Sequence, residues 1–150
     1  MKTVYILDTC ILNVLLHDSP AKQRNLKAKL ATVDDRDVWI SVVTVHEILI
    51  EGIAKAIKTR INRNDPKIVL AFSALTKFLD DLSDYQILPY TEKDDAYFQK
   101  LPARVKRKGS NDCRIAASAV NNNFVVVTQN TDDFEGTGAK CQDWTVSNGT

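Results

Sequence analysis

The chain has 150 residues, of which 44% are hydrophobic and 26% are charged, and its formal net charge is +1. This length suits one domain with a real core, so we treat residues 1–150 as a single domain. The composition excludes a disordered or fibrous chain, and the small net charge gives no overall argument for a polyanionic partner. The N-terminus has no signal-peptide pattern, and no apolar stretch approaches membrane-spanning length. We therefore expect a cytoplasmic protein without a membrane partner.

Strand and helix patterns alternate along the chain. In chain order they predict a strand at 4–7, helices at 11–16 and 21–32, a strand at 38–40, helices at 43–60 and 67–82, a strand at 86–88, helices at 91–100 and 112–120, a strand at 124–128 and an edge strand at 141–144. Pro102 should kink or end the helix before it, and the basic segment RVKRKGSND is expected to be a loop. This alternation predicts an α/β fold with a central, mostly parallel sheet of about four or five strands and helices on both faces.

Two of the predicted helices are clearly amphipathic. The helix at 43–60 has one apolar stripe, formed by Val43, Ile50, Ala54 and Ile57. The helix at 67–82 has an apolar face formed by Val69, Phe72, Leu75, Leu79 and Leu82.

Cysteine and histidine are too scattered to predict a zinc site or a disulfide framework. Cys10, Cys113 and Cys141 are odd in number and have no C-x-x-C spacing, and the two histidines lie far apart in the sequence. We interpret the cysteines as small buried hydrophobic residues.

Two acidic segments directly follow predicted strands. Asp8 ends the first strand, although aspartate is a poor strand residue and is costly to bury unpaired. TQNTDDF follows the strand at 124–128 and carries Asn130, Asp132 and Asp133. Taken alone, this segment also fits a turn in which Asn130 or Thr131 acts as a cap. In parallel sheets, however, ligands bind at the carboxyl ends of the strands, where both segments are expected to lie.

Two further acids are expected near helix starts. Asp112 falls in the first turn of its helix, where it could simply complement the helix dipole. Glu47 follows Thr44 by three residues, which fits a capping box, but it also lies on the apolar stripe, where a carboxylate needs a partner. Glu51, one turn later, is the rival to Glu47.

Brought to one edge of the sheet, Asp8, Glu47, Asp112 and Asp133 would form a metal site. Two carboxylates about 4 Å apart repel by roughly 4 kcal/mol at an effective dielectric constant near 20, so such a group needs a cation. Hard oxygen ligands without cysteine or histidine at matching spacing favour Mg²⁺ or Mn²⁺. Such an ion can activate water and bind a phosphoryl oxygen.

These motifs resemble the PIN domain and, within it, the VapC-type toxins of toxin–antitoxin pairs. The resemblance spans nearly the whole chain and rests on the order and spacing of ILDTCIL, SVVTVHEIL, SNDCRIAASAV and FVVVTQNTDDF. It implies that Asp8, Glu47 and Asp112 belong to the acidic set of the family. Many members have aspartate where this chain has Asn130, so Asp133 is expected to be the last acid. That departure bears on how many metal ions are bound.

The resemblance also implies roles for neighbouring residues and for partners. Thr9 and Thr128 would support the acids through their hydroxyl groups, Asn130 would orient water or an acid, and Arg114 would pair with an acid or contact phosphate. The implied activity is metal-dependent endoribonuclease cleavage of transfer RNA or ribosomal RNA, leaving a 3′-hydroxyl and a 5′-phosphate. The implied partners are RNA, a second copy of the chain and an antitoxin that inserts a segment near the site.

Two basic clusters support an RNA surface. The first consists of Arg104, Lys106, Arg107 and Lys108, and directly precedes Asp112. The second consists of Lys55, Lys58, Arg60 and Arg63, and follows the Glu47 segment. Phosphate contacts need such charges, although either cluster also fits a solvated helix face. No aromatic residue is interleaved with the first cluster, so base stacking is not indicated there.

Other functions remain open at this point. A different Mg²⁺-dependent phosphoryl-transfer domain with an aspartate nucleophile would want a second acid beside Asp8, which the Asp-Thr-Cys step lacks. A catalytically weakened PIN-like module that binds RNA or the antitoxin is favoured only by Asn130. A cysteine nucleophile is the least supported, because acids adjoin Cys10 and Cys113 and would raise the pKa of each thiol.

Overall fold

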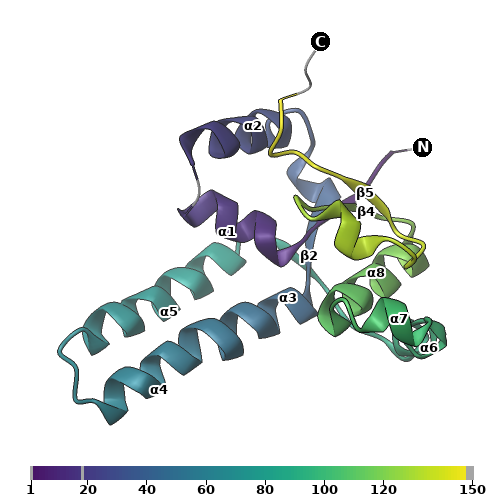
Figure 1. The fold of residues 1–150 in the computed structure, drawn as a ribbon. Coiled ribbons are helices and arrows are strands. Elements are labelled where there is room, and N and C mark those ends of the chain that lie inside the picture. Colours follow the sequence, from purple (N-terminus) through teal and green to yellow (C-terminus); the bar gives the residue numbers. More distant parts are fainter. Residues whose placement is uncertain (1, 18, 148–150) are drawn as a thin grey trace.

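The computed structural model describes residues 2–17 and 19–147, and Figure 1 shows the arrangement of its helices and strands. These residues form a five-stranded sheet. Its strands are β1 (Tyr5–Leu7), β2 (Val38–Ser41), β3 (Gln86–Leu88), β4 (Val125–Val127) and β5 (Lys140–Gln142). The strand order is β3-β2-β1-β4-β5, and all four pairings are parallel. This confirms the predicted α/β class and places β1 at the centre of the sheet.

The helices connect these strands in the predicted order, with two local differences. They are α1 (Thr9–His17), α2 (Pro20–Leu30), α3 (Val42–His46), the π-helix η2 (Glu47–Ala54), α4 (Lys55–Asn62), α5 (Ile68–Leu82), α6 (Glu92–Lys100), α7 (Ala103–Lys106) and α8 (Ser110–Asn122), with short 3₁₀ turns η1 (Asp35–Asp37) and η3 (Thr131–Phe134). The helix expected at 43–60 is thus interrupted by a π-helical stretch, and part of the expected basic loop is the short helix α7. As predicted, α6 ends before Pro102, because the residue before a proline avoids the helical conformation.

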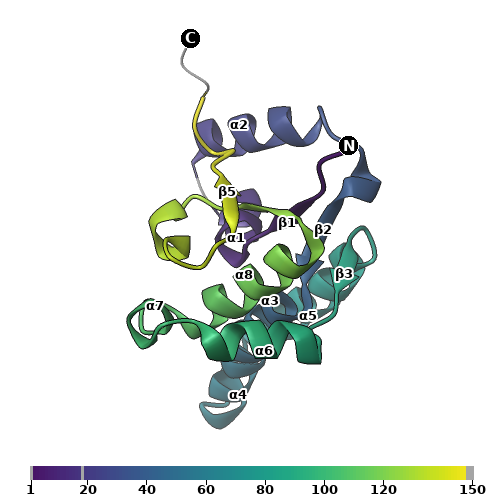
Figure 2. The same cartoon turned by 90° about the vertical axis from the view of Figure 1, so that its right-hand side faces the viewer.

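Alternate residues of the central strands build a separate core on each face of the sheet. Leu7 and Val127 pack on one face with residues of α1 and α2, such as Ile11 and Leu26. Ile6 and Val126 pack on the other face with residues of α8, and α6 covers α8 in turn (Figure 2). This is the expected consequence of the two-residue period of a strand, and it confirms that helices cover both faces.

The helices α4 and α5 form an antiparallel hairpin that projects away from the sheet (Figure 1). The apolar face predicted for α5 is therefore only partly covered: Leu75 and Leu82 are half-buried, whereas Val69 is 68% exposed and Leu79 is 55% exposed. Ile50, on the predicted stripe of the preceding helix, is also exposed. Apolar periodicity was correct about the helices but does not say whether a second layer covers them. No helix among the described residues is long and apolar enough to span a membrane.

Candidate active site

The carboxyl ends of β1, β2 and β4 meet at one edge of the sheet, because these strands are neighbours and parallel. Asp8 follows β1, Ser41 ends β2 and leads into α3, and Thr128 follows β4. Asp8 is only 4% exposed, so the carboxylate that ends the first strand is buried. The strand-end position predicted for this acid is therefore observed.

Hydrogen bonds hold the Asp8 carboxylate in place. The Thr9 backbone N–H donates to Oδ1 at 2.8 Å, the Thr128 hydroxyl donates to Oδ2 at 3.0 Å, and the Cys10 thiol donates to Oδ2 at 3.3 Å. Burial raises the pKa of Asp8, these three bonds oppose the rise, and the charge of Asp133 adds to it. The net direction is upward, because the effect of burial exceeds that of the three donors.

Glu47 is joined to the Asp8 segment through Thr9. The Thr9 hydroxyl donates to Glu47 Oε1 at 3.1 Å and lies 3.1 Å from the Thr44 hydroxyl. Burial raises the pKa of Glu47, the bond from Thr9 lowers it, and the charges of Asp8 and Glu51 raise it further.

The capping box suggested for Thr44 and Glu47 is wrong. Ser41 is the N-cap of α3, since its hydroxyl accepts from the Val43 N–H at 3.0 Å. Thr44 is buried one turn further along, where it contacts Thr9. Because Ser41 already caps the helix, Glu47 is free to face Thr9 from the first position of the π-helix.

Asp112 lies in the first turn of α8, and this helix packs on the sheet through Ala116 and Ala119. Ala116, Ala117 and Ala119 are fully buried. The Asp112 carboxylate accepts no hydrogen bond within the described part of the chain. Burial, followed by the charges of Asp8, Asp133 and Glu47, raises the pKa of Asp112 to about 7. Asp112 thus shares an electrostatic environment with the other three predicted acids.

Asp133 lies in η3, the turn that follows β4. Its backbone N–H donates to the Asn130 carbonyl at 3.0 Å, and its half-buried carboxylate has no hydrogen-bond donor among the described residues. Asn130 precedes the turn, and its backbone N–H donates to the Thr128 hydroxyl at 3.0 Å. The Asn130 side chain is exposed and does not cap the turn, contrary to one of the two capping alternatives.

The donor set fits a divalent cation in its chemistry. Asp8, Glu47, Asp112 and Asp133 offer hard oxygen ligands, and their mutual repulsion is what a cation relieves. The Cys10 thiol stays protonated at neutral pH, because burial and the charge of Asp8 raise its pKa to about 12. Over residues 2–17 and 19–147, however, no three His, Cys, Asp or Glu side chains stand close enough to share one ion. Ion binding therefore requires the carboxylates to draw together, and no hydrogen bond restrains Asp112 or Asp133.

The predicted substrate-binding cations differ in how they are placed. The Arg114 guanidinium lies 4.2 Å from the centre of the Phe98 ring, and the Lys106 ammonium lies 5.3 Å from it. Lys106 also donates to the Gln99 carbonyl at 3.3 Å. The other three predicted cations are exposed and make no side-chain hydrogen bond or ion pair with the described residues; they are Arg104, Arg107 and Lys108.

Sequence reasoning missed the roles of two residues, one at the site and one on the helix that covers α8. Cys10, interpreted as a buried hydrophobic residue, is half-buried and bonds to Asp8. Asp94 on α6 is fully buried and accepts from Ser118 and Asn121 of α8, at 2.9 Å and 2.8 Å. The Thr-x-x-Asp pattern at 91–94 predicted the start of a helix, and that capping box is present. The pattern alone could not show that Asp94 also ties this helix to α8.

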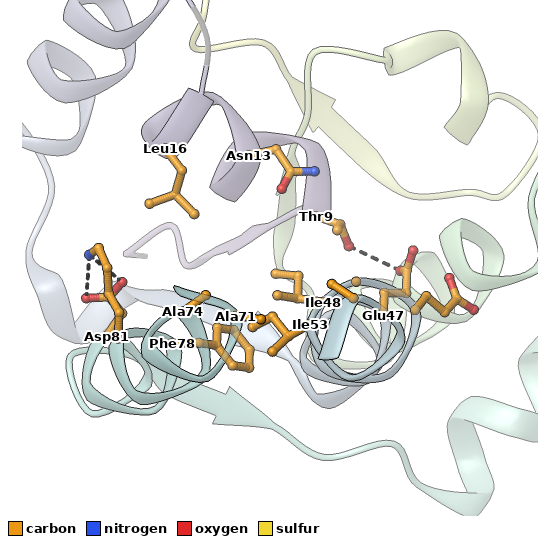
Figure 3. A pocket seen from close by; sticks show the side chains of 14 residues that line it. Thr9, Asn13, Leu16, Glu47, Ile48, Ile53, Ala71, Ala74, Phe78 and Asp81 are labelled. Carbon is orange, nitrogen blue, oxygen red and sulfur yellow. Dashed lines mark hydrogen bonds and ion pairs between the residues drawn. The ribbon is translucent and has the colours of Figure 1, made fainter. Parts of the chain in front are cut away.

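A groove of about 660 Å³ opens beside Glu47, between α1 and the helical hairpin (Figure 3). Thr9, Asn13 and Glu47 line one end, and Ala74 and Phe78 of α5 line the other. The groove is mostly apolar away from the acids, so it offers a continuous surface that runs from the acidic site along the hairpin.

The fold and the site together define an α/β domain with a group of acids at the carboxyl edge of a parallel sheet. The family model for the PIN domain matches residues 5–140, and the chain belongs to this family. PIN domains are nucleases, which hydrolyse nucleic acids, and they generally depend on divalent metal ions. This confirms the resemblance derived from the four sequence motifs.

Solved structures share the fold. VapBC2 from Rickettsia felis, bound to a promoter DNA fragment, has a TM-score of 0.67 and 24% identity, covering 95% of this chain and 99% of the other. VapBC-1 from nontypeable Haemophilus influenzae has a TM-score of 0.66 and 21% identity, covering 96% and 100%. FitAcB from Neisseria gonorrhoeae has a TM-score of 0.63 and 23% identity, covering 94% and 98%. The comparison with curated proteins gives no match.

Proposed function

We propose that this protein is a metal-dependent endoribonuclease, the toxin of a type II toxin–antitoxin pair, which hydrolyses phosphodiester bonds of structured RNA such as transfer RNA or ribosomal RNA. The observation that carries the proposal is the electrostatic coupling of Asp112 to Asp8, Asp133 and Glu47 at the carboxyl edge of a PIN-family sheet. A group of acids that repel one another in the absence of a cation is suited to bind Mg²⁺ or Mn²⁺.

In this proposal each residue has a separate task. Asp8, Glu47, Asp112 and Asp133 hold the cation, which when bound supplies a water of lowered pKa and neutralises charge on the phosphate. Thr128 and Thr9 orient Asp8 and Glu47 through the hydroxyl bonds described above. Three hydrogen-bond donors fix the position of the Asp8 carboxylate. The carboxylates of Asp112 and Asp133 have no such donors among the described residues and can move toward a cation.

The nuclease proposal is tested by incubating the purified protein with total cellular RNA and Mn²⁺ or Mg²⁺. Discrete fragments are expected, and they should disappear with EDTA and with Asp112→Asn. The matched control is Asp132→Asn, which makes the same change of charge at an exposed acid beside Asp133 and should leave cleavage unchanged. A folded, metal-loaded protein that cleaves no RNA, but binds it equally well in EDTA, would instead establish a weakened RNA-binding module.

The antitoxin is proposed to insert a segment into the groove beside Glu47. The structural neighbours are VapBC and FitAB assemblies, and the groove joins an apolar floor to the acidic site. Ala74→Arg should block the groove and abolish co-purification with a co-expressed antitoxin. Ser73→Arg, on an exposed position that does not line the groove, should preserve it. Retention of the complex by both variants would refute this placement.

A homodimer is proposed from the family resemblance, and the uncovered apolar face of α5 supports it. Val69, Phe72 and Leu79 are each about half exposed or more on this face. Exposed apolar residues in such a group are typical of an interaction surface. Sedimentation should show a dimer for the native chain and a monomer for Phe72→Lys, while a native monomer would contradict the proposal.

A further inference from the structure

Four basic residues lie along the helix α4 and its C-cap, and we call them the α4 strip; they are Lys55, Lys58, Arg60 and Arg63. No acidic residue occurs between positions 52 and 64. Arg60 pairs with Asp65 at 2.7 Å. The side chains of Lys55, Lys58 and Arg63 are exposed and make no ion pair or hydrogen bond to any described residue. Three cations of the strip are therefore free to bind an external anion.

The other basic cluster also offers three cations that are unpaired among the described residues, Arg104, Arg107 and Lys108. Lys106 and Arg114 lie against the Phe98 ring, and Lys106 is also bound to a backbone carbonyl. Each cluster therefore has one engaged cation, Lys106 in the first and Arg60 in the strip, and three that are unpaired within the described part of the chain. The α4 strip is preferred for its position, because it continues from the Glu47 helix without a break.

The strip continues directly from the acidic site. Glu47 begins the π-helix that leads into α4 without a break. At 1.5 Å per helical residue, Lys55 and Arg63 lie roughly 12 and 24 Å along the axis from Glu47. A depression of about 340 Å³ beside Lys55, Arg60 and Arg63 shares Gly52 and Ala56 with the groove that contains Glu47. The surface from the acids to the tip of the hairpin is therefore connected.

The chemistry of the strip indicates what it binds. Lysine and arginine side chains on successive turns contact phosphates, which position a nucleic acid without reading its sequence. No aromatic residue occurs between positions 52 and 64, so the strip has no platform for base stacking. We propose that the α4 strip binds the phosphate backbone of the RNA segment that flanks the cleaved bond. This inference rests on the proposed nuclease function, and it assigns the substrate's path beyond the acids.

The test compares two triple variants that remove the same charge. The first variant, Lys55→Gln/Lys58→Gln/Arg63→Gln, removes the three positive charges of the strip that are unpaired among the described residues. Arg24→Gln/Lys27→Gln/Lys29→Gln removes three cations from α2, which lies at the opposite end of the molecule in both views (Figures 1 and 2). Binding of total transfer RNA is measured in EDTA from 50 to 300 mM salt, so the readout does not depend on cleavage. Thermal melting confirms that both variants are folded.

The strip variant should bind transfer RNA at least about tenfold more weakly, and its log–log salt slope should be smaller by roughly 2, since each lost contact to single-stranded nucleic acid contributes about 0.7. In Mg²⁺ its KM should rise with kcat unchanged, because contacts remote from the cleaved bond bind substrate and transition state alike. The α2 variant should behave like the native protein.

The inference is overturned if the strip variant keeps native affinity, or if both variants weaken binding equally. An acidic protein segment would then be the better candidate for the strip. Weaker binding by the strip variant alone, in a protein that cleaves no RNA, supports the strip and counts only against the nuclease. Normal cleavage with unchanged binding counts only against the strip.

Discussion

Asp94 and Asp112 occupy the same position in two packed helices, yet their environments are opposite. Each is the third residue of its helix, α6 or α8. Asp94 accepts hydrogen bonds from Thr91, Ser118 and Asn121. Burial alone would raise the pKa of Asp94, but these bonds outweigh it and leave the pKa lowered. Asp112 accepts none from the described residues, and its pKa is raised to about 7.

The N-cap residue explains part of this difference. Thr91 caps α6 and exchanges hydrogen bonds with Asp94 in a capping box. Gly109 stands at the equivalent position of α8 and has no side chain that could exchange hydrogen bonds with Asp112. A Cβ at position 109 would lie 2.8 Å from Asp112 Oδ2, so the glycine also leaves the space that this carboxylate uses. One acid stabilises the fold, and the other is left uncompensated at the site where a cation is proposed to bind.

The largest expected effect on stability comes from replacing Asp94, the compensated acid. Asp94→Asn should lower the free energy of unfolding by about 3 kcal/mol. The buried carboxylate with several donors is replaced by an amide, whose NH₂ group cannot accept the hydrogen bond that the Asn121 side chain donates. Since the pKa of Asp94 is lowered in the folded state, its ionisation contributes to stability above pH 4. This stability is lost as the pH falls below 4 and Asp94 becomes protonated. Chemical denaturation at pH 7 and at pH 3 measures it. Glu92→Gln, an exposed acid of the same turn, should cost only a few tenths of a kcal/mol.

Replacing Asp112, the uncompensated acid, should have the opposite effect on the stability of the metal-free protein. Asp112 has a folded-state pKa near 7, above the ordinary value of about 3.9, so its ionisation destabilises the metal-free fold between these pH values. Asp112→Asn should therefore stabilise the metal-free protein by about 2 kcal/mol at pH 8, after allowance for partial exposure, and by almost nothing at pH 4. Unfolding curves in EDTA at the two pH values measure this. If Asp112→Asn instead destabilises the protein at pH 8, then Asp112 is not an uncompensated acid and does not differ from Asp94 in this way.

A third change tests the role of the glycine. Gly109→Ala should displace the Asp112 carboxylate and reduce cleavage by about tenfold, while stability changes by less than about 1 kcal/mol because a flexible side chain can yield. Gly52→Ala is the matched control, since a Cβ there meets no other atom within 4 Å. Full activity of Gly109→Ala would show that the space beside Asp112 is not needed.

The smallest expected effect comes from restoring the acid that many family members have. Asn130 is exposed and its side chain does not cap the turn, so Asn130→Asp should fold normally. An added carboxylate should strengthen Mn²⁺ binding severalfold, equivalent to about 1 kcal/mol, and lower metal-free stability by a few tenths. Calorimetric titration with Mn²⁺ measures the change. Unchanged affinity would place Asn130 outside the metal site.

The sequence predicted the sheet and its edge because the signals were local. A buried parallel strand is a continuous apolar run, and an acid directly after such a run must lie at the carboxyl edge, as Asp8 does. The roles of Asp94 and Cys10 depend on residues that lie far from them in the sequence, such as Ser118 and Thr128. The cap of α3 was placed at Thr44 instead of Ser41, because both residues fit the same short pattern. Exposure of the α5 face depends on what packs against it, which periodicity does not encode.

The most direct measurement is a carboxyl-carbon NMR titration of Asp112, without metal and with saturating Mg²⁺. We predict a pKa near 7 without metal, because burial and then the charges of Asp8, Asp133 and Glu47 raise it, and a clear fall when Mg²⁺ binds. Asp94 reports in the same spectra as an internal control, with a lowered pKa that Mg²⁺ does not change. An Asp112 that titrates near the ordinary value of about 3.9 and ignores Mg²⁺ would contradict the shared acidic site.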